Sequence, residues 1–423
     1  MSRSRDHRLL EIRAPTGTAA DAFERGLRNL LQAVGDPLAE IEPALNEHPG
    51  FVMGHLLRAA VAVLAKDAKA LPLLGSELTA ARRADLRPTD HERRHLAAGR
   101  AWLCGEPELA AERYAAILRD WPRDLLALRL AQSCYFFVGQ TAALRDVTDL
   151  VAPTWSCGTP GFECFLAMAA FARAENGDSG RAETFGRWAV EIEPRFPFAI
   201  HAVAHALHAR GDYRGGALWM RRHQGQWQNA GGIVAHNAWH LAQFELAAGA
   251  PERALATLDQ HLIPAAFLSA SSTADATALL WRLQLDGFDP GWRWRVLSNC
   301  WKAHSSPGFW PFLDLHAGIA FNAAGSFDRA LRLERAVAVC AATDSDRARR
   351  ARLLTLPGLR AIEAFVAEAY GTASVALGAL RPALDQLGAS QAQISLFERT
   401  RMEAERRCRR SPRLRLSKQA VEA

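Results

Sequence analysis

The 423-residue chain is long enough for two or three compact domains or for one elongated array. With 49% hydrophobic and 23% charged residues, its composition is that of an ordinary soluble protein that can bury a core. The net charge of +6 is concentrated at the two ends of the chain and leaves a nearly neutral body. This distribution argues against nucleic acid as a partner, because such binding needs a basic surface on the folded part.

No targeting or membrane segment is expected. The N-terminal stretch 1–15 is basic, but the apolar run of a signal peptide does not follow it. The longest apolar run, at 165–172, is far shorter than the roughly 18 residues of a membrane span. The seven cysteines include no CxxC pair, which is typical of reduced thiols that pack mostly in the core. We therefore expect a cytoplasmic protein without a membrane partner.

The chain reads as a series of helix pairs. A basic segment, 1–17, precedes a first pair expected at 18–33 and 36–49. From there one pattern recurs, a helix of small and apolar residues, a glycine turn, and a second helix that ends at a proline. Second helices at 108–122 and 180–194 carry their small residues and prolines at identical offsets. First helices are expected at 51–65, 91–105, 125–139, 161–177, 197–211, 233–249, 272–287 and 309–325.

The spacing of these first helices is close to the period of about 34 residues of a tetratricopeptide repeat. The sequence therefore predicts an all-α fold, a tetratricopeptide-repeat-like right-handed α-solenoid of antiparallel helix pairs over 18–345, and no pair of β-strands. After 345 the period loosens, and irregular capping helices are expected over 346–405. The basic tail 406–423 is expected to be disordered.

Two histidine pairs lie on successive first helices. His201 and His205 are four residues apart, as are His236 and His240, so each pair shares one helix face. The two pairs are 35 residues apart, which is one repeat. Because the first helices of such an array line its concave face, the four imidazoles are predicted to converge.

The next two first helices add carboxylates and one more imidazole, at Asp275, Asp314 and His316. Neighbouring helices pack about 10 Å apart, so these groups are expected to join the same site. His and Asp side chains suit a divalent transition metal, Zn²⁺, Fe²⁺ or Mn²⁺. The candidate metal ligands are His205, His236, His240 and His316.

A metal with an open position activates water, which points to a hydrolase or lyase acting on a small molecule in a concave pocket. Asp275 and Asp314 are the candidate catalytic groups, as general base, ligand or orienting residue. The HAVAH and HNAWH segments lack the glutamate of the HExxH signature, so no particular reaction follows. Further candidates for contacting the small molecule are His201, Asn237, Trp239 and Arg282.

Two other interpretations stay open. Buried histidines on apolar helix faces usually have structural hydrogen bonds, and this is the role expected for His55, His95 and His208. Alternatively, the array is a non-catalytic scaffold that binds a protein or peptide partner in its groove. Such a partner surface in the first half of the chain would use Arg58, Arg93, Arg94 and Arg129.

Several segments together resemble the tetratricopeptide repeat protein 38 family. They are FVMGH, HAVAH, HNAWHLAQFELAAG with the following ERAL and LDQHLIP, ALLWRLQLDG, FLDLH and LGASQAQ, in this order over about residues 20–400. The resemblance implies a helical-repeat fold and no particular reaction. Where the family tends to have Arg-Asp after the last motif, this chain has Ile394 and Ser395.

Overall fold

Helices make up almost all of the chain that the computed structural model describes, which is residues 4–5, 11–83 and 88–410. The prediction of an all-α fold is confirmed. One small exception is an antiparallel pair of two-residue strands, β1 (Ser4–Arg5) and β2 (Glu11–Ile12), which the sequence analysis did not foresee. The chain forms two compact units, Met1–Phe244 and Glu245–Ala423, where one continuous array was expected through 345.

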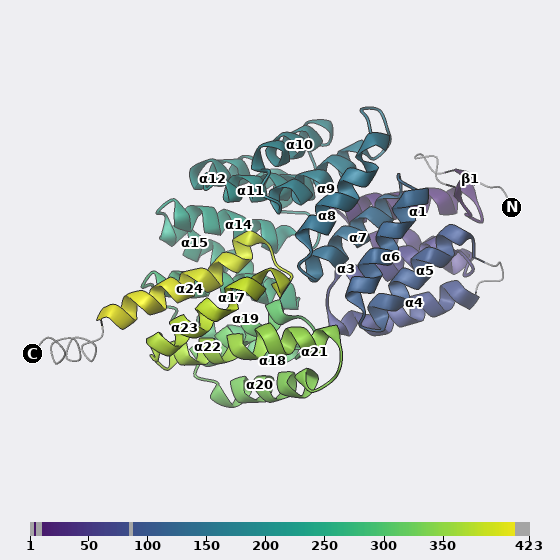
Figure 1. Cartoon of the computed structure of the whole chain (residues 1–423). Helices are drawn as coiled ribbons and strands as arrows, with labels where there is room; N and C mark the ends of the chain where they lie inside the picture. Colours follow the sequence, from purple (N-terminus) through teal and green to yellow (C-terminus); the bar gives the residue numbers. More distant parts are fainter. Residues whose placement is uncertain (1–3, 6–10, 84–87, 411–423) are drawn as a thin grey trace, which may run out of the picture. The chain divides into compact units, whose positions relative to one another are not determined.

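Unit 1 is built from successive helix pairs whose members lie against each other (Figure 1). Within it α9 packs on both α7 and α11, so nearly every residue of α9 and α11 is buried. The helices of this unit are α1 (Gly17–Gln32), α2 (Pro37–Glu47), α3 (Val52–Leu64), α4 (Leu71–Arg83), α5 (Asp90–Leu103), α6 (Pro107–Asp120), α7 (Leu125–Phe137), α8 (Thr141–Val151), α9 (Phe162–Ala174), α10 (Ser179–Ile192), α11 (Pro197–Ala209), α12 (Tyr213–Arg222) and α13 (Gln224–Trp227), followed by α14 (Val234–Ala247), which contains the boundary between the units.

The helices begin and end where the local sequence satisfies their free backbone groups. Many first turns are capped by a Thr, Asp or Ser side chain that accepts a backbone N–H, such as Thr16, Asp124 and Ser269. The turn after each first helix from α5 to α19 holds a glycine with positive φ, a conformation that other residues reach only at a cost. These glycines are Gly105, Gly139, Gly177, Gly211, Gly249, Gly287 and Gly325.

Unit 2 continues the pairing beyond residue 345, since α22 packs on α23 and α23 on α24. Its irregular turns are a π-helical turn η3 (Leu258–Leu262), a second one, η4 (Ala351–Thr355), and a 3-10 turn η5 (Arg381–Leu387). Its helices are α15 (Pro251–Thr257), α16 (Ile263–Ala266), α17 (Ala270–Leu285), α18 (Arg293–His304), α19 (Pro311–Ala323), α20 (Phe327–Ala341), α21 (Asp346–Arg350), α22 (Leu356–Val366), α23 (Tyr370–Leu380) and α24 (Gln391–Arg410).

The prediction of a disordered tail from residue 406 is wrong for its first five residues, because α24 continues to Arg410. Glu403 forms ion pairs with Arg406 and Arg407, three and four residues later, and such pairs stabilise a helix end. The remainder, 411–423, lies outside the described residues.

Two further expectations concern the chain as a whole. All seven cysteines are free thiols, although only Cys134, Cys164 and Cys300 are buried. Within the described ranges, no helix has the length and apolar character that a bilayer crossing requires.

Candidate metal centre

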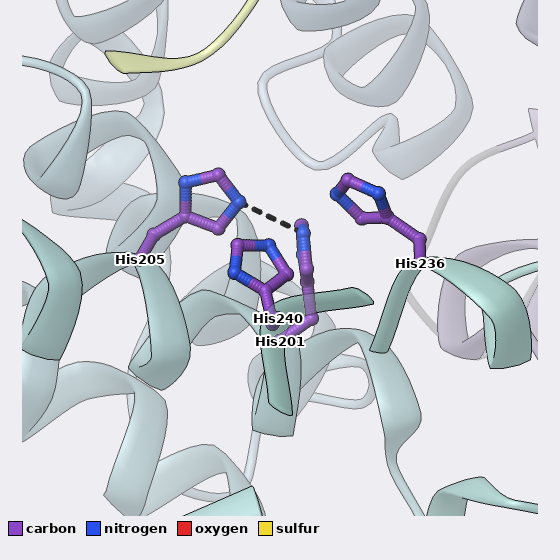
Figure 2. A group of neighbouring side chains, drawn as sticks. All are labelled: His201, His205, His236 and His240. Carbon is purple, nitrogen blue, oxygen red and sulfur yellow. Dashed lines mark hydrogen bonds between the residues drawn. The ribbon is translucent and has the colours of Figure 1, made fainter. Parts of the chain in front are cut away.

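Four histidine side chains meet within unit 1, two from α11 and two from α14. One ligand atom of each of His201, His205, His236 and His240 lies within 4.8 Å of the others. Figure 2 shows the four imidazoles gathered around one point, with His205 and His236 on opposite sides of the other two rings. The spacing of four residues along each helix and the packing of neighbouring repeats together produce this convergence.

The ring of His205 is oriented by a carboxylate. Its Nδ1 lies 2.7 Å from Oε1 of Glu175, the residue that caps the C-terminus of α9. If this Nδ1–H donates to the carboxylate, a neutral His205 carries its lone pair on Nε2. This Nε2 lies 2.8 Å from Nε2 of His201. A carboxylate that holds the distal nitrogen of a histidine is the usual arrangement behind a metal-ligating imidazole.

His240 is the histidine whose hydrogen bonds are least satisfied. Its side chain is fully buried, and neither ring nitrogen has a hydrogen-bond partner among the residues described. Nδ1 of His201 lacks one as well in this part of the chain. A buried polar atom without a partner costs about 1–3 kcal/mol. The cluster therefore contains polar atoms that the described protein groups do not satisfy.

Burial keeps two of the four imidazoles neutral. It lowers the pKa of His240 well below the usual value, and the neighbouring His205, His236 and His201 lower it further. The pKa of His201 is lowered well below its usual value in the same way, with Arg129 as an additional positive neighbour. Since a metal binds the deprotonated imidazole, both rings are in the ligating form at neutral pH.

His236 is the partly exposed member of the four, whereas the other three are buried. Its ring stacks on Trp239, with centroids 5.1 Å apart and planes inclined by 14°. Asn237 is fully buried, and its Oδ1 has no hydrogen-bond partner within the described ranges. These two predicted ligand-contacting residues thus lie on the same helix turn as the metal-ligand candidates.

The donor set fits a transition metal better than a hard cation. A tetrahedral ion with N ligands at 2.0–2.1 Å separates its donor atoms by about 3.3 Å. The Nε2 atoms of His201 and His205 are 2.8 Å apart, which is shorter than this separation. The ligand atoms of all four residues lie within 4.8 Å of one another, an upper bound that is longer than it. Four imidazoles suit Zn²⁺ or Fe²⁺, whereas Mn²⁺ prefers more oxygen ligands.

The other predicted site residues lie in unit 2 and do not belong to this group. Asp275 and Arg282 are on α17, and Asp314 and His316 are on α19, all of them buried. The expectation that His316 shares one site with the four histidines stays a prediction. Nδ1 of His316 bonds the carbonyl oxygen of Phe312, which is the structural role of a helical histidine, and burial lowers its pKa to about 4.

Arg282 connects the middle of unit 2 with its last helix. Its Nη2 donates to the carbonyl oxygen of Ala392 and to the hydroxyl of Ser395, at the motif where the resembled family tends to have Arg-Asp. Burial lowers the pKa of Arg282 to about 9. Ser395 is thus a direct contact of a buried guanidinium.

Asp314 provides a pH-dependent stability test. Burial raises its pKa to about 8, although the N–H of Gly308 donates to its Oδ2. Between about pH 4 and pH 8 the carboxyl is protonated in the folded chain and ionised in the unfolded one. Stability should therefore fall by up to about 1.4 kcal/mol per pH unit as the pH rises through this window, and level off above it. Urea unfolding at pH 6 and pH 8 measures this dependence of stability on pH. The Asp314→Asn variant should show a smaller dependence. An equal dependence in the variant would refute the raised pKa of Asp314 as its cause.

A second cluster, which the sequence analysis missed, lies on α5. Nε2 of His91 and Nε2 of His95 lie 2.6 and 2.7 Å from the same oxygen, Oδ2 of Asp124, and all three side chains are buried. Its signal was present in the sequence, because residues 91–95 read HERRH and match HExxH. His95 was expected to be structural through a backbone bond, whereas its partner is a carboxylate.

This second cluster is satisfied by its own hydrogen bonds. The other oxygen of Asp124 accepts the N–H of Ala127 as the cap of α7. Glu92, at the place of the catalytic glutamate in HExxH, instead bonds the backbone N–H of Thr89 in a capping box. Burial alone would raise the pKa of Asp124, but His95 and His91 hold it well below its usual value. The geometry is that of a structural clasp between α5 and α7.

Comparison with known proteins adds little to this description. No family model matches the chain. Among solved structures it is similar to a tetratricopeptide repeat protein from Parabacteroides merdae ATCC 43184, at 11% identity and a TM-score of 0.36, over 82% of this chain and 100% of that one. The fold assignment therefore rests on the helix pairs themselves.

Proposed function

We propose that this protein binds one divalent transition-metal ion, Zn²⁺ or Fe²⁺ in preference to Mn²⁺, and that a small molecule reacts there. The ligands are His201, His205, His236 and His240, with Glu175 holding His205. The observation that carries the proposal is the fully buried imidazole of His240, whose two nitrogens have no partner among the described groups. A bound ion would satisfy one of the two ring nitrogens of His240 and would explain why the four rings converge.

The chemistry proposed is hydrolysis or a lyase reaction. An ion held by the four imidazoles would take water or the small molecule as a fifth ligand, and it would then lower the pKa of that water or polarise a carbonyl. Within this chain, Glu175 keeps the lone pair of His205 Nε2 directed into the cluster. His236 is the partly exposed ring, so it lies where a small molecule enters, beside Trp239. Asp275 and Asp314 stay candidate catalytic groups from the sequence alone, and the metal proposal does not depend on them.

Metal analysis of the full chain, prepared without a histidine tag, tests the proposal. Elemental analysis and titration with Zn²⁺ should find one ion per chain. A second ion is not expected because His91 and His95 already donate to Asp124. Absence of any bound or titratable transition metal would overturn the proposal, and two ions per chain would show that the HERRH cluster also binds.

Glu175→Gln is expected to weaken Zn²⁺ binding by about 10- to 100-fold, which is typical for a carboxylate behind a ligating histidine. The amide keeps the size of the side chain but accepts more weakly from Nδ1–H, so His205 loses its preferred tautomer. Isothermal titration against the unchanged protein measures the effect. Glu77→Gln, at the carboxylate that bonds His55, is the matched control and should leave Zn²⁺ affinity unchanged.

The alternative function is a scaffold for a protein or peptide partner, which the helical-repeat architecture would support. Against it, three of the four arginines expected to form the partner surface already have carboxylate partners. Arg58 pairs with Glu77, and Arg93 and Arg94 pair with Asp90. We also propose, from the sequence motifs alone, that the chain belongs to the tetratricopeptide repeat protein 38 family.

A further inference from the structure

A strip of three aromatic rings, Phe136, Phe171 and Phe198, adjoins the four histidines within unit 1. Phe171 is its centre, with ring centroids 5.5 Å from Phe136 and 6.2 Å from Phe198. The same ring lies 5.2 Å from His205, and the ring of Phe198 lies 5.7 Å from His201. The strip is thus continuous with the candidate metal ligands.

Each end of the aromatic strip carries a cation. The guanidinium carbon of Arg129 lies 4.4 Å from the ring centroid of Phe198, and Nζ of Lys66 lies 4.7 Å from that of Phe136. Both cations and Phe136 are partly exposed, so this surface is accessible. Phe171 and Phe198 are buried beneath it.

Arg129 differs from the other arginines singled out in the first half of the chain. It has no ion pair with a described residue, and its buried Nε has no hydrogen-bond partner there. Burial lowers its pKa to about 10, so the guanidinium is still charged at neutral pH. Burial and the charge of Arg129 together lower the pKa of Lys66 to about 7. The charge of Arg129 is therefore not balanced by an ion pair with any described residue.

The carboxylate of Glu175 is engaged by His205, whose ring contacts Phe171 of the strip. A guanidinium that is partly buried without a carboxylate is well suited to bind one from a ligand, because two parallel N–H donors match a carboxylate or phosphate. The aromatic strip would meanwhile cover an apolar portion of that ligand.

We propose that the small molecule bound at the four-histidine site is an organic anion, a carboxylate or phosphate monoester with an aromatic or apolar body. Arg129 binds the anionic group with help from Lys66, and the body lies against the partly exposed ring of Phe136, with Phe171 and Phe198 beneath. The anionic group then lies on the side of His201, because Arg129 lies on the ring of Phe198, whose centroid is 5.7 Å from that of His201. This inference rests on the proposed metal site.

Binding of simple aromatic probes to the Zn²⁺-loaded full chain tests the inference. Benzoate and phenyl phosphate should both bind by isothermal titration, and the neutral isostere benzamide should bind at least about tenfold more weakly. A clear preference for one of the two anions would identify the class of anionic group. Equal binding of benzoate and benzamide, or no binding of either anion, would overturn the inference.

Variants separate the anion site from the metal site. Arg129→Met should weaken binding of the preferred anion at least about tenfold while Zn²⁺ affinity stays within about threefold. Arg129→Lys keeps the charge and should bind the anion with intermediate affinity. This result would show that the loss in Arg129→Met does not come from a folding defect. Lys66 has a φ of 49°, so Lys66→Gly removes the ammonium without straining the backbone and should weaken binding about threefold.

Arg181→Met is the matched control, because Arg181 is an exposed arginine on α10 that pairs with Asp178. It removes the same charge and should leave anion binding unchanged. If Arg129→Met binds the anion as tightly as the unchanged protein, the inference fails while the metal site stands. If the chain binds no Zn²⁺, the proposed function fails and this inference fails with it.

Discussion

Replacing His240 with alanine is expected to lower Zn²⁺ affinity by at least about a hundredfold. Structural zinc sites contribute about 10–16 kcal/mol over four ligands, so one ligand accounts for roughly 3 kcal/mol. The loss should appear in isothermal titration. It should also appear in thermal unfolding, where saturating Zn²⁺ raises the stability of the unchanged protein by about 2.7 kcal/mol at 100 times Kd. His240→Ala should show almost none of this increment.

The stability of the metal-free protein provides the contrast. His240→Ala removes two buried nitrogens that lack partners among the described residues, so it should cost less than the usual truncation of a buried side chain. His55→Ala is the control, since His55 is bonded to Glu77 and to the carbonyl oxygen of Pro49. It should destabilise the metal-free chain without changing Zn²⁺ affinity. Undiminished Zn²⁺ binding by His240→Ala would contradict the assigned ligand set.

Asp124→Ala is expected to cause the largest loss of stability of any single change discussed, about 3–5 kcal/mol. The substitution leaves the Nε2 atoms of His91 and His95 without their acceptor and removes the cap bonded to the N–H of Ala127. Two buried donors thus lose their acceptor, and the start of α7 loses its cap. Urea unfolding of the metal-free protein measures the change.

Asp124→Asn tests the cause of this loss. The amide keeps one acceptor for the cap or for one histidine, so a loss of about half that of Asp124→Ala is expected. Neither variant should change the Zn²⁺ stoichiometry, because the clasp is separate from the four histidines. A loss below about 1 kcal/mol for Asp124→Ala would show that the clasp does not stabilise the contact between α5 and α7.

Much of the local structure was predictable from the residues alone. The expected first helix at 197–211 is α11 (Pro197–Ala209), and that at 309–325 is α19 (Pro311–Ala323). These predictions succeeded because helix periodicity, the glycine turn and the proline at the end of each second helix are local signals. The helical end of α24 was missed because its stability comes from ion pairs along the helix, which a count of charges does not reveal.

The candidate site was predicted only in part. His201 and His205, and likewise His236 and His240, share a helix face by their spacing, and one repeat separates the pairs, so sequence sufficed to place these four together. His316 occupies an equivalent position on its own helix, but a common period does not say that two helices belong to one compact unit. Glu175 was also missed, since a carboxylate at a helix end carries no mark of the histidine it will meet.

The sequence by itself determined the helix pairs, their period and the shared face of each histidine pair, because these depend on interactions within a few residues. Only the tertiary structure decided that His91 and His95 of HERRH bond Asp124, that Arg129 has no ion pair among the described residues, and that Glu175 holds His205. These outcomes depend on which partners packing brings within hydrogen-bond distance, and residues 29 or more positions apart in the chain carry no local signal of that choice.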